Sequence, residues 1–151
     1  MAADTGGTAA AAGKAGPGEA VVATGSCLCG GVRYRIDGPL RPVTTCHCSQ
    51  CRRTSGHFVA ATEAASADLV LTSSETLRWY TSSPEAERGF CARCGGNLFW
   101  RPLKAGRNRT SIMAGTLDPP THLTIARHIF VADKSDYYTL QDGVPQSTGW
   151  P

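Results

Sequence analysis

Apolar and polar side chains alternate over short segments of this chain, and Gly, Pro and Ser separate the segments. Residues 32–36 read Val-Arg-Tyr-Arg-Ile, so Val32, Tyr34 and Ile36 share one face and the arginines the other. This period of two is typical of a strand with one buried face. By the same criterion, further strands are expected at residues 42–46, 57–62, 68–71, 76–80, 87–91, 97–101, 110–114 and 128–132.

Helical periodicity is almost missing from the sequence, and only residues 49–54 are expected to form a helical turn. Residues 104–109 predict a polar hairpin loop, and Asp118-Pro119-Pro120 predicts a rigid turn because proline cannot donate a ladder hydrogen bond. Many short strands broken by turn residues indicate a mainly β protein made of small antiparallel sheets.

The first 23 residues differ in composition from the rest. They contain nine Ala and five Gly, and Val21 and Val22 are their only strongly apolar side chains. Such a segment has too little to bury, so we expect residues 1–23 to form a flexible tail and residues 24–151 to form one domain. The formal net charge of +3 is mild.

No run of 18 strongly apolar residues occurs, and the N-terminal 20 residues lack the basic and apolar regions of a signal peptide. We therefore expect no membrane association. The chain has seven cysteines, an odd number that intramolecular disulfides cannot use up, and they are clustered. Clustered thiols of this kind indicate metal binding in a reducing compartment, so a cytoplasmic location is expected.

The cysteines form three groups, at residues 27–29, 46–51 and 91–94. Cys91 and Cys94 have the spacing of a zinc knuckle, and a Gly-Gly pair follows them. Cys27 and Cys29 are followed by the same pair. Two similar turns can together supply the four sulfurs of a closed, structural Zn²⁺ site, which uses four of the seven thiols.

The middle group leaves three thiols, Cys46, Cys48 and Cys51. Three protein ligands with a free fourth position are typical of a catalytic zinc. Two alternatives stay open: His47 or His57 closes the second site, or the groups exchange partners. A structural role is favoured for His47, because alternation along a strand points it away from the metal.

Three segments carry a resemblance to a known family: GSCLCGGV at residues 25–32, CHCSQCRRTSG at residues 46–56 and FCARCGGNLF at residues 90–99. They resemble the glutathione-dependent formaldehyde-activating enzymes and the centromere-protein-V-like proteins grouped with them, over residues 24–145. The resemblance implies the Mss4-like fold of small β-sheets around zinc. It also implies two Zn²⁺ per chain, a structural ion on Cys27, Cys29, Cys91 and Cys94 and a catalytic ion on Cys46, Cys48 and Cys51.

The activity implied by this resemblance is that of a carbon–sulfur lyase, which reversibly joins glutathione and formaldehyde as S-hydroxymethylglutathione. The expected partners are therefore a small thiol and an aldehyde. Arg52 and Arg53 follow the middle cysteine group directly. They either offset the charge of the metal site or bind a substrate carboxylate, for which a guanidinium provides two parallel hydrogen bonds.

A non-enzymatic Mss4-like module that binds a protein or a nucleic acid is the alternative. Such a module needs only the four-cysteine site, so the three further cysteines argue for an enzyme. The arginines are scattered among acids, and 61 residues separate Cys29 from Cys91, which argues against a nucleic-acid-binding zinc finger. Trp150 is expected either to cover the open site or to lie on the surface.

Overall fold

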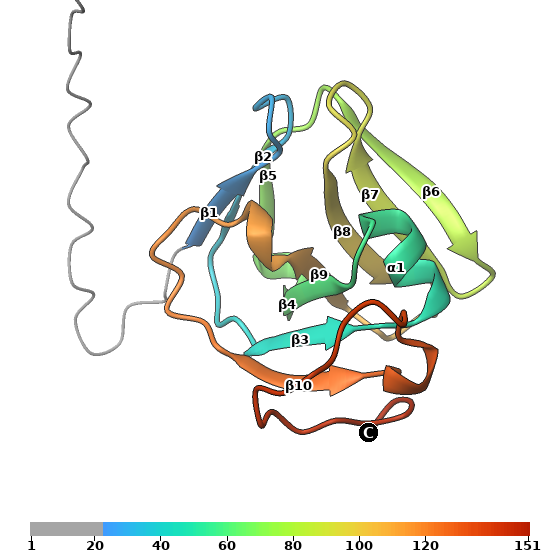
Figure 1. Cartoon of the computed structure of the whole chain (residues 1–151). Helices are drawn as coiled ribbons and strands as arrows, with labels where there is room; N and C mark the ends of the chain where they lie inside the picture. Colours follow the sequence, from blue (N-terminus) through green and yellow to red (C-terminus); the bar gives the residue numbers. More distant parts are fainter. Residues whose placement is uncertain (1–22) are drawn as a thin grey trace, which may run out of the picture.

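The computed structural model describes residues 23–151, which form two β-sheets and one short α-helix (Figure 1). The mainly β class expected from the sequence is confirmed. The expected tail, residues 1–23, lies outside the described residues except for Ala23, which begins the first strand. None of the helices within residues 23–151 is long and apolar enough to cross a membrane.

The smaller sheet has three antiparallel strands in the order β1-β2-β5. These strands are β1 (Ala23–Ser26), β2 (Arg33–Ile36) and β5 (Leu69–Ser73). Tyr34 and Ile36 are buried and the two arginines of β2 are exposed, as the alternation predicts. Strand β1 was not predicted, because its four residues are small or polar and show no apolar alternation.

The larger sheet has seven strands in the order β10-β3-β4-β9-β8-β7-β6. Their bounds are β3 (Val43–Cys46), β4 (Val59–Ala65), β6 (Leu77–Ser83), β7 (Ala86–Cys91), β8 (Asn97–Pro102), β9 (Arg109–Met113) and β10 (Ile125–Ile129). Six of the expected strands thus lie here within a few residues of their expected positions, and the loop expected at 104–109 joins β8 to β9.

The last expected strand, 128–132, is displaced. Strand β10 ends at Ile129, because Phe130 takes the left-handed conformation with φ 56° and residues Val131–Asp133 form a 3₁₀ turn. Strand β10 also pairs with β3 in parallel, whereas an antiparallel arrangement was expected throughout. The chain reaches this edge through the long connection 117–124, which gives it room to enter in the same direction as β3 (Figure 1).

The expected helical turn is present as α1 (Ser49–Ser55), and both of its ends are capped. The sulfur of Cys48 accepts a hydrogen bond from the Cys51 N–H at 3.4 Å. At the other end Gly56 has φ 78°, a conformation that glycine adopts without strain, and its N–H donates to the Arg52 carbonyl at 2.9 Å. Residues 48–56 therefore hold a fixed position after β3.

The core lies between the two sheets, where Tyr34, Ile36, Leu98, Phe99 and Ile112 are almost completely buried. The rings of Tyr34 and Phe99 meet edge to face with centroids 5.2 Å apart. The Tyr34 hydroxyl hydrogen-bonds Thr116 Oγ1 at 2.6 Å, which satisfies its polar atom inside the core. This packing holds the small sheet, with its Cys27-Cys29 turn, against the large one.

Candidate metal centres and active-site pocket

Four cysteines meet where the β1–β2 turn approaches the β7–β8 turn. The sulfurs of Cys27, Cys29, Cys91 and Cys94 all lie within 4.8 Å of one another. The Cys29 sulfur is 3.6 Å from those of Cys27 and Cys91, too far for a disulfide, and all seven cysteines are free. A set of four thiols at this separation fits the closed tetrahedral Zn²⁺ site.

Hydrogen bonds reach two of the sulfurs in this cluster, and a hydrogen bond to a sulfur favours the thiolate, which is the form that binds a metal cation. The Val32 N–H donates to the Cys27 sulfur at 3.3 Å, and the Thr76 hydroxyl lies 3.0 Å from the Cys91 sulfur. The hydrogen bond from Thr76 lowers the pKa of Cys91 to about 5, which favours the thiolate. Gly95 adopts φ 74°, and its N–H donates to the Cys91 carbonyl, which turns the chain back so that Cys94 faces Cys91.

A second cluster forms at the end of β3. Cys46 is the last residue of that strand, Cys48 caps α1 and Cys51 lies in the first turn of the helix. Their three sulfurs lie within 4.8 Å of one another, and within residues 23–151 no histidine or carboxylate joins them at that distance. Neither His47 nor His57 therefore provides a fourth ligand in this arrangement, and the donor set fits a zinc with one open position.

The three thiols of this cluster are not equivalent. Hydrogen bonds from the side chains of Cys46 and Cys51 lower the pKa of Cys48, and the same contact with Cys48 raises the pKa of Cys46. These contacts favour the thiolate form at Cys48 and the protonated form at Cys46. Cysteines bind a metal as thiolates, so binding of a metal at this cluster is accompanied by release of protons.

His47 is fully buried and points away from the sulfurs, as strand alternation predicts. Its Nε2 lies 3.1 Å from Thr45 Oγ1 and 3.2 Å from His128 Nδ1, and its Nδ1 lies 2.5 Å from the Tyr138 hydroxyl. Burial lowers the pKa of His47 to about 4, so the ring is neutral near pH 7. The histidine connects the strand of Cys46 to β10 and the C-terminal segment.

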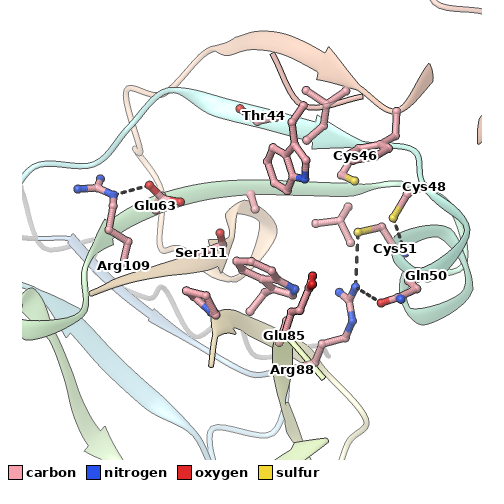
Figure 2. Close-up of a pocket in the computed structure, with 18 of the residues that line it drawn as sticks. Thr44, Cys46, Cys48, Gln50, Cys51, Glu63, Glu85, Arg88, Arg109 and Ser111 are labelled. Atoms are coloured by element: carbon pink, nitrogen blue, oxygen red, sulfur yellow. Dashed lines mark hydrogen bonds and ion pairs between the residues drawn. The ribbon is translucent and has the colours of Figure 1, made fainter. Parts of the chain in front are cut away.

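The three-cysteine cluster lies at one end of a pocket of about 1160 Å³ (Figure 2). Glu63 and Arg109, which form an ion pair, lie at the opposite end. The walls between these ends are largely apolar. They include Val59, Ala61, Trp100, Met113, Ile129 and Phe130.

Trp150 also lines this pocket, although the residue is 71% exposed. Its ring packs edge to face against Phe130, with centroids 5.5 Å apart. Trp150 is thus a surface residue, one of the two positions expected for it, and a role in covering the three-cysteine site stays a prediction.

Arg52 and Arg53 were expected either to offset the charge of the metal site or to bind a substrate carboxylate. Arg52 and Arg53 lie on α1, and neither lines the pocket. The arginine at the cysteines is instead Arg88 of β7, which is 5% exposed. Its Nη2 lies 3.8 Å from the Cys51 sulfur and 3.4 Å from Gln50 Oε1 (Figure 2).

Sequence reasoning did not find Arg88, because it stands next to the 91–94 cysteine group and contacts the 46–51 group. The sequence feature that could have pointed to Arg88 is its position in the alternation of the expected strand 87–91. There it shares a face with Phe90, an unusual place for a cation.

Comparison with known proteins relates this chain to a family of enzymes. The profile of the glutathione-dependent formaldehyde-activating enzymes matches residues 22–133. An uncharacterized lyase of Schizosaccharomyces pombe is 30% identical over 117 residues, which cover 76% of this chain and 82% of the relative. A Halomonas elongata protein named "Putative glutathione-dependent formaldehyde-activating enzyme" is 37% identical over 83 residues, which cover 50% of this chain and 53% of that protein.

A solved structure has the same fold. The crystal structure of a Rhodobacter sphaeroides protein superposes with a TM-score of 0.53 at 21% identity, covering 83% of this chain and 99% of the other. Together with the two cysteine clusters and the family match, the two-sheet architecture agrees with the Mss4-like fold expected from the sequence.

Proposed function

Because this chain belongs to the family of glutathione-dependent formaldehyde-activating enzymes, we propose that it is a zinc-dependent carbon–sulfur lyase. Its proposed substrates are a glutathione-like thiol and a small aldehyde such as formaldehyde. The observation that carries the proposal is the cluster of three sulfurs, without a fourth ligand among residues 23–151, at the end of a large pocket. The name of the fission-yeast relative, a lyase, supports the reaction class.

Two Zn²⁺ per chain are proposed. Cys27, Cys29, Cys91 and Cys94 would hold a structural ion, and Cys46, Cys48 and Cys51 would hold a catalytic one. A zinc in the three-cysteine site supplies a Lewis acid that favours the deprotonated form of a substrate thiol. The free cysteines are consistent with a reducing compartment, and we propose a cytoplasmic location.

In the forward reaction the S–H bond of the thiol and the π bond of the aldehyde carbonyl break, a carbon–sulfur bond forms, and the proton lost by the thiol is balanced by one taken up at the carbonyl oxygen. The reverse reaction breaks this bond and releases both substrates. The pocket supports this chemistry through its apolar walls near the sulfurs, such as Val59 and Met113, which restrict water around the reacting atoms. The pocket also has room for a tripeptide-sized thiol beside the aldehyde.

Binding of a substrate carboxylate by Arg52 or Arg53 stays a prediction, because the side chains that line the pocket do not include either one. Arg109 lines the end of the pocket that lies far from the cysteines. It offers a cation to an elongated thiol substrate that carries a carboxylate. Its partner Glu63 fixes the guanidinium in the wall.

The experiment that tests the function is NMR exchange spectroscopy of glutathione and its formaldehyde adduct, with the zinc-replete protein. The exchange rate is expected to rise in proportion to protein concentration. The Cys48→Ala variant is the matched control, and it is expected to lose one zinc and the acceleration together. If the wild-type protein with two zinc ions gives no acceleration for glutathione or for other small thiols, the lyase proposal fails and the binding-module alternative is favoured.

A further inference from the structure

We propose that Arg88 is the counter-ion of the three-cysteine cluster, a positioning residue that donates a hydrogen bond to the Cys51 sulfur and thereby controls the electron donation of that sulfur to the metal. The inference rests on the proposed metal binding by Cys46, Cys48 and Cys51. It does not depend on which thiol or aldehyde reacts there.

The backbone of Arg88 is held on both sides in the large sheet. It lies opposite Tyr80 of β6 and Trp100 of β8. Strand alternation places Arg88 and Trp100 on the pocket side and Glu87 and Arg101 on the other, and only the first two line the pocket. The guanidinium therefore reaches the cysteines from a rigid element rather than from a loop.

Arg88 lacks the usual partner of a buried arginine. The exposed arginines Arg35, Arg101 and Arg109 each form an ion pair with a carboxylate. No Asp or Glu among residues 23–151 forms one with Arg88, although Glu85 lines the same pocket. Its Nε is also buried without a hydrogen-bond partner. An unpaired buried cation is destabilising, so the cysteine cluster that Arg88 contacts is the place where we expect a compensating negative charge.

The formal charges match. A Zn²⁺ ion held by three thiolates carries one net negative charge, which the single positive charge of Arg88 neutralises. Gln50 orients the guanidinium by accepting from the Nη2 that faces Cys51. An N–H···S hydrogen bond withdraws electron density from the sulfur, so the metal receives less of it and remains a better Lewis acid.

Cobalt substitution makes this effect visible, because Co²⁺ bound to thiolates has a charge-transfer band whose energy depends on the sulfur. In the Arg88→Met variant of the full chain, the sulfur loses its hydrogen bond, and the band is expected to move to longer wavelength. Release of this ion to a chromogenic chelator is expected to accelerate on the order of tenfold, because the net negative charge of the three-thiolate site is no longer neutralised, and this effect outweighs the stronger donation of the sulfur. The ion of the four-cysteine site is expected to be released as in the wild type.

Arg101→Met is the matched control. It makes the same change on the neighbouring strand β8, at a side chain that is 46% exposed, pairs with Glu87 and lies outside the pocket. Its cobalt spectrum and its release kinetics are expected to equal those of the wild type. A merely structural role of Arg88 would leave the band energy of the folded variant unchanged.

Arg88→Lys carries the test if Arg88→Met does not fold. Lysine keeps the charge but cannot reproduce the planar fork, so the band is expected to move in the same direction by a smaller amount. Two bound cobalt ions with unchanged band and release rate in either folded variant would overturn the role of Arg88 alone. A wild-type chain that binds no cobalt at Cys46, Cys48 and Cys51 would overturn the proposed function as well.

Discussion

The hydroxyl of Thr76 lies 3.0 Å from the sulfur of Cys91, and both residues are buried. Thr76 stands immediately before β6 and also fills the space beside Gly31, where an added Cβ would come within 2.5 Å of its hydroxyl oxygen. One threonine thus contacts both Gly-Gly turns of the four-cysteine cluster. The position of this side chain links the four-cysteine cluster to the packing of the two sheets.

Thr76→Val is expected to destabilise the zinc-replete protein by roughly 1–3 kcal/mol, because valine has the same shape but cannot donate to the Cys91 sulfur. The measurement is urea denaturation with zinc present. Thr72→Val, at an exposed position of β5, is the control, and its effect is expected to stay within about 0.5 kcal/mol. Equal stabilities of the two variants would show that the O–H···S contact does not matter.

Loss of one ligand is expected to have different consequences in the two clusters. Cys91→Ala should unfold the domain or lower its melting temperature strongly, because the four-cysteine site joins segments far apart in the sequence. Cys48→Ala should leave a folded protein with one zinc fewer and no activity, since its cluster lies within six residues. Thermal denaturation and zinc analysis measure both. A similar loss of melting temperature in the two variants would contradict this division of roles.

The alkaline stability of the protein is expected to depend on Tyr34. Burial raises the pKa of Tyr34 to about 12, whereas the unfolded chain has the ordinary value of 10.0. Between these values the unfolded state releases a proton that the folded state keeps, so the free energy of unfolding falls as pH rises from 10 to 12. Below pH 10 this loss is absent.

Tyr34→Phe tests the point, because phenylalanine has no proton to release. The variant should lose about 1 kcal/mol at pH 7 with the hydrogen bond to Thr116, and its stability should decline less steeply above pH 10. The exposed residue Tyr80 provides the control as Tyr80→Phe, which should keep the wild-type slope. Parallel curves for wild type and Tyr34→Phe would refute the assignment.

Most of the strands could be predicted from the sequence, because the alternation of apolar and polar side chains that marks a strand is visible in a few consecutive residues. The alternation in residues 32–36 reports a buried face directly. The helical turn expected at residues 49–54 is also present, whereas its caps at Cys48 and Gly56 were not predicted. The parallel pairing of β10 with β3 was not predictable in this way, because the direction of an edge strand depends on its connection and on packing. Strand β1 was missed because its backbone pairing, not its side chains, makes it a strand.

The same limit applies to the site. The grouping of the seven cysteines was expected from their spacing, and the structure brings the expected sets together. The partner of the three-cysteine cluster was sought next to it in sequence, at Arg52 and Arg53. Arg88 reaches it instead across 37 positions, through a sheet register that no local pattern specifies.

The four-cysteine cluster joins residues 27–29 to residues 91–94, and the whole three-cysteine segment lies within the loop that this contact closes. A metal bound at the four-cysteine cluster would therefore close a loop of the chain that contains the three-cysteine cluster. Loss of that metal removes one closure constraint on a loop of about 60 residues, whose entropic cost of closure grows slowly with its length. A chelator that removes the metal from the four-cysteine site should therefore also loosen the arrangement of Cys46, Cys48 and Cys51, in addition to any metal that it takes from them directly.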